Sequence, residues 1–194
     1  MGRPAKFDQE ALVGAVGRVV ADGGPGAVTV RRVAAAAEAP IGSVYHRFAT
    51  LELLVATAWV DAVRAFQVGY LAALALDDVD DAARSAAVHV PSWAAEHPER
   101  AALLMRHSRE DLVERWPEEL GPVLEDLNGS LSEALRAHAR ARYGHGGQGE
   151  LLAVHYALVH LPEAAVRATT RPALLADAVG AAALAALAAH DPRR

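Results

Sequence analysis

The sequence predicts an all-α protein, and three observations support that fold class. Alanine, leucine and valine dominate a chain that is 53% hydrophobic, whereas aromatic residues make up only 5%. Such a composition favours helices over strands. Apolar residues recur at spacings of three and four, which is the period of one helix face. The length of 194 residues leaves room for a small domain of about 50 residues and a larger one with its own core.

Two helices are expected before residue 38. An apolar stripe over 8–21 predicts the first, and the run Gly23-Gly24-Pro25-Gly26 ends it. The second is expected over 30–37. Thr29 is a good N-cap for it, because its hydroxyl can accept a hydrogen bond from the free backbone N–H groups of the first turn.

A third helix, expected over 41–48, points to function. Pro40 fits its first turn, where the missing N–H costs nothing, and Ile41, Val44 and Phe48 are expected to be buried. The outer face is expected to carry small, hydroxyl, aromatic and basic side chains: Gly42, Ser43, Tyr45, His46 and Arg47. A short helix with such a face suits the major groove of DNA. The pattern therefore predicts a helix-turn-helix, and a plain helical hairpin is the alternative that it leaves open.

Six more helices are expected after residue 49, which brings the total to nine. They are predicted over 50–76, 80–97, 98–113, 117–143, 150–169 and 172–190. The carboxylates of residues 77–81 suit the N-terminus of the second of these helices, and the glycine-rich stretch 144–149 is expected to be a loop.

The N-terminal part of the chain resembles TetR-type transcriptional regulators over about residues 7–57. The residues that carry the resemblance are Thr29, Val33, Ala34, Gly42, Ser43, Tyr45, Phe48 and the run Glu52-Leu53-Leu54. Three positions depart from the family pattern. Glu38 stands where the turn usually has glycine, Pro40 where serine or threonine is common, and Leu51 where a lysine usually starts the fourth helix.

The resemblance implies a nine-helix, two-domain architecture and a regulatory function. A helix-turn-helix DNA-binding domain is expected over 1–49, and a helical ligand-binding and dimerisation domain over 50–194, with 50–76 as the connecting helix. The implied protein is a repressor that binds a palindromic operator as a homodimer and is released by a small-molecule effector. An activator of the same family, and a helical interaction protein that does not bind DNA, are the alternatives.

The charge distribution agrees with DNA binding, although the total charge does not. The chain carries a formal net charge of −5. Residues 1–50 hold six basic and four acidic side chains, a balance of +2, which leaves −7 for the remainder. A mildly basic module on an acidic body turns the correct end towards phosphate. Because the excess is small, binding is expected to depend on dimerisation and on salt.

Nine residues are candidates for DNA contacts: Thr29, Arg31, Arg32, Gly42, Ser43, Tyr45, His46, Arg47 and Thr50. Helix N-termini favour anions, so the capping residues Thr29 and Thr50 are expected beside phosphates. Of Arg31 and Arg32, one is expected to contact phosphate and the other to be a solvated charge.

The third helix supplies the remaining candidates. Gly42 lets that helix approach DNA closely, and Tyr45 and His46 are expected on phosphates. The arm Gly2-Arg3-Pro4 is expected either in a neighbouring minor groove or as a disordered tail.

The last two helices have the composition of a dimer interface. Residues 179–189 are apolar on nearly every side, so they are expected to be buried all round. Helix-turn-helix proteins usually need two-fold symmetry to reach two half-sites. We therefore expect residues 150–190 of two chains to form a four-helix bundle, with a core helix of a single chain as the alternative. The interface candidates are Leu174, Ala178, Ala182, Ala185 and Ala189.

Aromatic and polar residues in apolar surroundings are candidates for an effector pocket, given that the resembled family senses ligands in this region. They are His89, Trp93, Met105, Trp116, His155, Tyr156 and His160. The alternative for each is an ordinary core or surface residue.

Several functions are not expected from this sequence. The absence of cysteine excludes disulfides, thiolate zinc sites and cysteine nucleophiles. No motif for metal binding, phosphate binding or nucleophilic catalysis occurs, and His155 and His160, five apart, are expected on different helix faces. We therefore expect no enzyme, metal or cofactor. A cytoplasmic protein without a membrane partner is expected, because signal-peptide features are absent and the apolar stretch 173–189 is slightly too short to span a bilayer.

Overall fold

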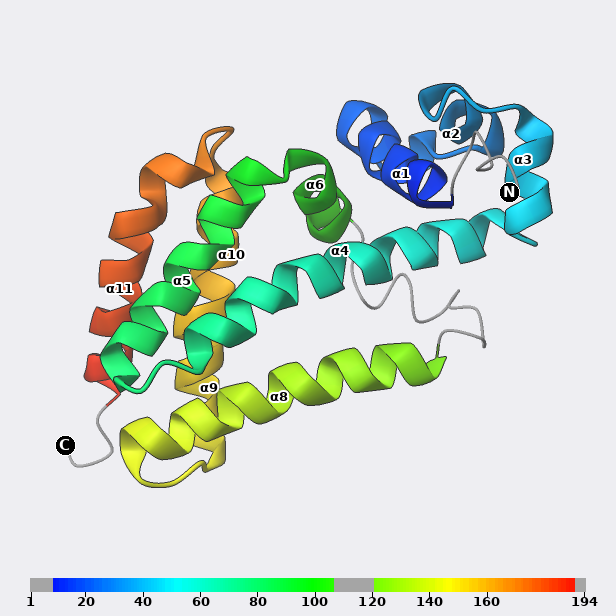
Figure 1. Ribbon diagram of the computed structural model, residues 1–194. Coiled ribbons are helices and arrows are strands. Elements are labelled where there is room, and N and C mark those ends of the chain that lie inside the picture. The colour runs from blue at the N-terminus through cyan, green and yellow to red at the C-terminus, as the bar shows by residue number, and fades with distance from the viewer. Residues whose placement is uncertain (1–8, 107–120, 191–194) are drawn as a thin grey trace, which may run out of the picture. The chain divides into compact units, whose positions relative to one another are not determined.

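The computed structural model describes residues 9–106 and 121–190, and every regular element in these ranges is helical (Figure 1). Ten α-helices are present there. Because α9 (Gln148–His155) and α10 (Leu161–Ala168) are joined end to end by a π-helical turn, the described residues form nine continuous helical runs. The all-α fold class is confirmed.

Packing divides the chain into two compact units. The first comprises Met1–Arg64 and Pro98–Glu125, and the second comprises Ala65–His97 and Asp126–Arg194. Two helices, α4 (Leu51–Leu74) and α8 (Gly121–Tyr143), contribute residues to both units. Because this is a division by packing, the functional boundary expected after residue 49 stays a prediction.

The first unit holds the N-terminal helices. Their bounds are Gln9–Gly23 for α1, Val30–Ala36 for α2, Ile41–Arg47 for α3 and Pro98–Arg106 for α6. α1 packs against both α2 and α6 and buries the stripe Leu12, Val16 and Val20. The backbone of α6 comes close at Gly17, where an added Cβ would lie 3.2 Å from the carbonyl oxygen of Glu99.

Two arginine side chains bind these helices to one another. Arg18 of α1 donates from Nη2 to the carbonyl oxygen of Ala36, at the end of α2, over 3.0 Å. Arg106 of α6 donates from Nη1 to the carbonyl oxygen of Val20 over 3.3 Å. Both acceptors lie in the last turn of a helix, where cations are favoured.

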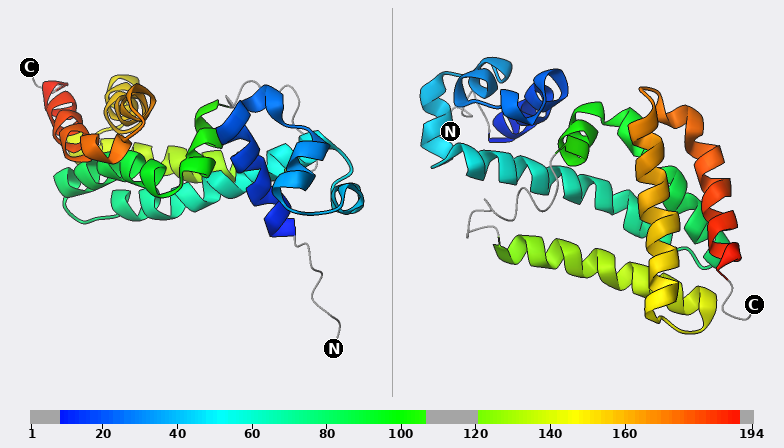
Figure 2. Two further views of the ribbon diagram at one scale, coloured as in Figure 1. Left: turned by 90° about the horizontal axis from the view of Figure 1, so that it is seen from above. Right: turned by 180° about the vertical axis from the view of Figure 1, so that it is seen from behind.

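The second unit is built around α5 (Val79–Glu96). Its other elements are the ends of α4 and α8, the run α9–α10 with its π turn η3 (Tyr156–His160), and the 3₁₀ turn η4 (Pro172–Leu175) that leads into α11 (Ala176–Ala189). α11 packs along α5 and lies antiparallel beside the α9–α10 run (Figure 2). Gly180 permits the close contact, because a Cβ there would lie 2.9 Å from Cγ2 of Val88.

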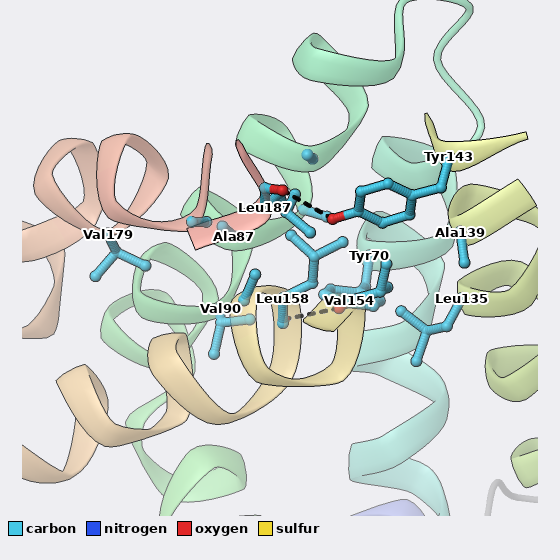
Figure 3. Packing of buried hydrophobic residues seen from close by; sticks show 14 residues of the cluster. Tyr70, Ala87, Val90, Leu135, Ala139, Tyr143, Val154, Leu158, Val179 and Leu187 are labelled. Atoms are coloured by element: carbon cyan, nitrogen blue, oxygen red, sulfur yellow. Dashed lines mark hydrogen bonds between the residues drawn. The ribbon is translucent and has the colours of Figure 1, made fainter. Parts of the chain in front are cut away.

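One cluster of buried side chains fills this unit (Figure 3). Alanines of α5 leave room for larger residues of the surrounding helices, among them Tyr70, Leu135, Tyr143, Val154, Leu158 and Leu187. Both buried tyrosines have a hydrogen-bond acceptor: the Tyr70 hydroxyl donates to the carbonyl of Leu158 over 2.8 Å, and that of Tyr143 to the carbonyl of Leu187 over 2.9 Å. The tyrosines therefore fill space without leaving a polar group unsatisfied.

The helix expected over 98–113 is described as far as Arg106, and both its expected end and the expected start of the next helix at 117 lie outside the described residues. Two other helices differ from the expected ones. The helix expected over 172–190 begins with the 3₁₀ turn η4. The helix expected over 150–169 contains the π turn Tyr156–His160, which a plain 3.6-residue pattern does not predict.

Within a single chain α11 is buried on one side only, so the burial all round that was expected for a dimer stays a prediction. Val179, Ala183 and Leu187 are buried against α5, but Ala182 and Ala185 on the opposite side are exposed. In the part of the chain that the structure describes, α11 packs chiefly on α5 and the α9–α10 run, and Tyr143 of α8 reaches the carbonyl of Leu187.

The C-terminal helical stretch also corrects an expectation about length. Pro172–Ala189 is 18 residues long and apolar enough to cross a membrane by length and composition, with 33% of it buried. The expectation that the stretch 173–189 is too short to span a bilayer was therefore wrong. The core helix of a soluble protein fits the same criteria, and α11 packs on α5.

Candidate nucleic-acid interface

The second helix begins where the sequence predicts. Thr29 has extended backbone angles, and its Oγ1 accepts from the backbone N–H of Arg32 over 3.2 Å, so the expected N-cap of α2 is confirmed. Thr29 is itself exposed. A helix N-terminus of this kind attracts an anion such as a phosphate.

α2 ends in a Schellman motif that contains Glu38. The backbone N–H of Ala39 donates to the carbonyl of Ala34 over 2.9 Å, and that of Glu38 to the carbonyl of Ala35 over 3.1 Å. Glu38 takes the left-handed conformation with φ of 53°. Glycine adopts that conformation at little cost and other residues do not. The geometry of the turn thus explains why glycine suits this position better than the glutamate present.

α3 is anchored by its second turn. Val44 and Phe48 are buried, as expected, but Ile41 is 47% exposed, so the expectation that Ile41 is buried was wrong. α3 is only seven residues long and starts at Ile41. Its first turn therefore extends past the small core that holds its second turn. Pro40 is the N-cap of α3 rather than a residue of its first turn.

The outer face of α3 presents the expected side chains to solvent. Tyr45 is 63% exposed and His46 is exposed, whereas Ser43 and Arg47 are half-buried. Arg47 folds back along its own helix, with Nη1 3.4 Å from the carbonyl oxygen of Ser43. An added Cβ at Gly42 would meet no atom within 4 Å. The fold itself therefore does not require glycine there, and close approach of a partner remains a reason for it.

The structure distinguishes the two arginines of α2. Arg32 forms an ion pair with Asp22 of α1, with Nη2 and Oδ2 2.9 Å apart. Arg31 is exposed and has no ion-pair partner among the described residues. Arg31 is thus the one free to meet a phosphate, and Arg32 is the paired charge.

Thr50 closes this surface at the start of α4. Its Oγ1 accepts from the backbone N–H of Leu53 over 3.0 Å, so the expected cap of the fourth helix is confirmed. All nine DNA-contact candidates thus lie in the first unit, along α2, α3 and the first turn of α4. The arm Gly2-Arg3-Pro4 lies outside the described residues.

The effector-pocket candidates fall into separate groups. His89 and Trp93 of α5 belong to an aromatic cluster with Phe66 and Tyr70 of α4, in which the ring centroids of Phe66 lie 5.2 Å from those of Tyr70 and His89 and 5.3 Å from that of Trp93. The sequence analysis did not single out Phe66 and Tyr70. Phe66 and Tyr70 are four residues apart, as are His89 and Trp93. This shared spacing is the sequence feature from which the pair could have been predicted.

His89 is held in a defined state within this cluster. Its Nε2 lies 3.0 Å from the carbonyl oxygen of Phe66, which can only accept, so Nε2 carries the proton. Burial lowers the pKa of His89 below its ordinary value, and the hydrogen bond to Phe66 opposes that shift. The imidazole is therefore a neutral, apolar-faced group in the wall of the aromatic cluster.

The other candidates lie elsewhere. Met105 is on α6 in the first unit, and Trp116 lies outside the described residues. Tyr156 is 56% exposed and His160 is exposed, on the outer side of the α9–α10 run. His155 is half-buried on that run.

The π turn also corrects the expected placement of two histidines. Because a π turn brings residues five apart into register, His155 and His160 do not lie on different faces. Burial lowers the pKa of His155, and the nearby charge of His160 and then that of Arg136 lower it further. Among the described residues, no group of three or more His, Asp and Glu side chains could hold a metal ion.

The first unit contains a surface cleft that sequence reasoning missed. Its volume is about 410 Å³, and its lining residues are Gln9, Glu10, Val13, Thr57, Val60, Asp61, Arg64 and Val123. Asp61 is paired with Arg100 of α6, with Nη2 and Oδ2 2.9 Å apart. None of the predicted effector residues within 9–106 and 121–190 lines this cleft.

The interface candidates share one exposed surface. Leu174 is 76% exposed, and Ala178, Ala182, Ala185 and Ala189 of α11 are all exposed. On the adjacent α9–α10 run, Leu152 is 68% and Tyr156 56% exposed. We call the exposed residues of α11 and of this run the outer helical face. Exposed apolar side chains that lie together can mark an interaction surface.

Comparison with solved structures identifies the fold. No family model matches the sequence, and no curated protein matches it either. The TetR family transcriptional regulator PfmR from Thermus thermophilus is 18% identical, with 90% of this chain and 97% of that chain covered and a TM-score of 0.72. A bacterial regulatory protein of the TetR family from Rhodococcus is 20% identical, with 94% and 97% covered and a TM-score of 0.75. FadR from Bacillus subtilis, a transcriptional regulator in complex with stearoyl-CoA, is 13% identical, with 92% and 99% covered and a TM-score of 0.70. The chain therefore has the fold of TetR-family transcriptional regulators.

Proposed function

We propose that the protein is a ligand-responsive transcriptional regulator of the TetR type that binds a palindromic DNA operator as a homodimer. The observation that carries the proposal is the surface of α2 and α3. A capped helix N-terminus and the exposed side chains of Arg31, Tyr45 and His46 lie on it. Such side chains position a recognition helix on phosphates and in the major groove.

The outer helical face supports dimerisation. Its alanines would let a second copy of α11 approach closely, and Leu152 and Leu174 would lose the solvent exposure that they have in a single chain. Burying apolar surface contributes about 25 cal/mol per Å². Because a two-fold dimer carries two recognition helices, this face also provides the symmetry that a palindromic operator requires.

The effector is proposed to be a small molecule with substantial apolar surface, and its binding is proposed to release a repressor from DNA. The aromatic cluster around His89 supplies apolar surface with one polar group, the usual character of a small-molecule site. The FadR structure from Bacillus subtilis contains stearoyl-CoA, which is in keeping with an apolar effector. A repressor of this kind works in the cytoplasm and is not an enzyme.

A selection of duplex DNA by the purified protein tests DNA recognition. The probe is the region upstream of the protein's own gene, followed by a random duplex library. We expect a discrete, roughly two-fold site. Tyr45→Ala combined with His46→Ala should abolish its retention while the dimer stays intact. Arg136→Ala with Arg140→Ala removes two exposed charges of α8 and should leave retention unchanged. An absence of any selected site would favour the helical interaction protein instead.

Sedimentation equilibrium tests the dimer. Ala182→Glu with Ala185→Glu places two carboxylates on the outer helical face, and we expect monomers that no longer bind the selected site. Ala141→Glu, at an exposed alanine of α8, is the matched control and should remain dimeric. A dimer that survives both glutamates would place the interface elsewhere.

A further inference from the structure

The α9–α10 run contains one turn of a different helix type. In η3 the backbone N–H of Leu161 donates to the carbonyl of Tyr156, five residues back. Pro162 follows directly and is buried. π turns inside α-helices are rare and occur frequently at functional sites, so this one calls for a structural cause.

Within this turn lies a carbonyl group that an α-helix could not satisfy. In an α-helix the carbonyl of Leu158 would accept from the N–H of residue 162, but proline has none. Leu158 is fully buried, so water cannot replace the missing donor. The hydroxyl of Tyr70, from α4, donates to this carbonyl over 2.8 Å (Figure 3). Tyr70 is itself 2% exposed.

The same turn has an inner and an outer side. Ala157 and Leu158 point into the core of the second unit, and Tyr156 and His160 lie on the outer helical face. Each residue of an α-helix turns the chain by about 100°. A return of this turn from π to α geometry would therefore rotate the residues on one side of it by roughly that angle relative to those on the other.

We propose that Tyr70 is a positioning residue for dimerisation: its hydrogen bond to the Leu158 carbonyl holds the π turn and so fixes the direction of Tyr156 and His160 on the outer helical face. The inference rests on the proposed dimer through residues 150–190. It assigns to Tyr70 of α4 a role in presenting a surface that Tyr70 does not itself reach.

Three variants separate positioning from simple stability. Tyr70→Phe removes the donor and should lower the urea midpoint and raise the dimer dissociation constant by about tenfold or more. Pro162→Ala supplies a backbone N–H for Leu158 and should favour the α register. It should therefore weaken the dimer without lowering the urea midpoint. In the double variant, the new N–H replaces the lost hydroxyl. Its urea midpoint should recover from that of Tyr70→Phe, whereas its dimer affinity should not.

Tyr143→Phe is the matched control. It removes a second buried hydroxyl from the same core, whose acceptor, the carbonyl of Leu187, lies near the end of a regular α-helix. It should lower the urea midpoint with little change in the dimer constant. Dimer constants come from sedimentation equilibrium without denaturant, on folded protein.

The outcomes distinguish the inference from the proposed function. If the wild-type chain is monomeric, the proposed dimer is wrong, and the inference that rests on it is wrong as well. If the wild type is a dimer but Tyr70→Phe dimerises equally well, the inference alone is wrong. It is also wrong if the double variant regains dimer affinity together with stability, because the hydrogen bond would then matter for stability only.

Discussion

Gly69 of α4 lies directly against the imidazole of His89 on α5, so that a Cβ atom at position 69 would overlap Cε1 of the ring. The hydrogen bond from His89 Nε2 to Phe66, one turn earlier on α4, holds the ring in that place. The two helices thus meet where one has no side chain and the other has a fixed aromatic ring, and the proposed effector cluster is built on that contact.

Gly69→Ala should destabilise the fold. Overpacking a well-filled site costs about 1–3 kcal/mol, which exceeds the gain of about 0.5–1 kcal/mol from replacing a glycine inside a helix. Urea unfolding measures the difference. In a His89→Ala background the ring is gone, and the same alanine at position 69 should become stabilising. If Gly69→Ala is equally harmful in both backgrounds, the contact with His89 is not the reason for the glycine.

Glu38→Gly should stabilise the protein. The left-handed backbone at this position costs a residue with a Cβ about 1 kcal/mol or more, and glycine avoids that cost. Glu38→Gln is the control, since it removes the charge and keeps the strain. We expect a higher urea midpoint for the glycine variant alone. Both variants should bind the selected operator more tightly, because each removes a carboxylate beside phosphate. A gain in stability from glutamine equal to that from glycine would attribute the effect to charge.

Gly42→Ala should separate stability from DNA binding. Apart from the adjacent residues and the backbone of α3 itself, no described atom lies within 4 Å of the added Cβ, so the fold should gain about 0.5–1 kcal/mol from the better helix former. Operator affinity should fall, since the methyl group stands between α3 and the DNA. Gly129→Ala on α8, an exposed position that is equally open, should give a similar gain in stability without loss of affinity. Unchanged operator binding by Gly42→Ala would mean that α3 does not approach DNA at this position.

Local signals in the sequence predicted the helix-turn-helix well. Thr29 and Thr50 cap the helices that follow them, and Val44 and Phe48 are buried, because capping and the periodicity of a helix depend on a few neighbouring residues. Ile41 has the same spacing as Val44 but is exposed. Whether Ile41 is buried depends on how far the core extends past α3, and the spacing of apolar residues gives no information about that extent.

The effector cluster and the π turn were harder to predict. Phe66 and His89 meet only because α4 and α5 pack together, and a single sequence does not show which turns of two helices are opposite each other. The sequence shows Pro162, but not how the carbonyl that loses its donor there is satisfied. The donor is the hydroxyl of Tyr70 in α4, 92 positions before Pro162. Tertiary contacts of this kind decide local helix geometry against the intrinsic preference of the segment.

Stability should fall as the pH is lowered from about 8 to about 5.5, because the folded state resists protonation of three histidines. Burial is the largest cause of a lowered pKa at His89, His138 and His155. The charge of Arg142 lowers the pKa of His138 further, and Asp80 opposes it. Nε2 of His138 has no hydrogen-bond partner among the described residues, so no hydrogen bond at that atom stabilises the imidazolium that would form there.

The direction of the effect follows from proton uptake. An unfolded chain binds protons at its histidines below about pH 6.5, whereas the folded protein does so only at a lower pH. Between these values the unfolded state holds more protons, so the free energy of unfolding decreases as the pH decreases. Urea midpoints at several pH values measure this decrease in the free energy of unfolding. His155→Gln, at the least buried of the three sites, should make the midpoint depend less steeply on pH. A midpoint that rises on acidification would show that these histidines gain protons on folding instead.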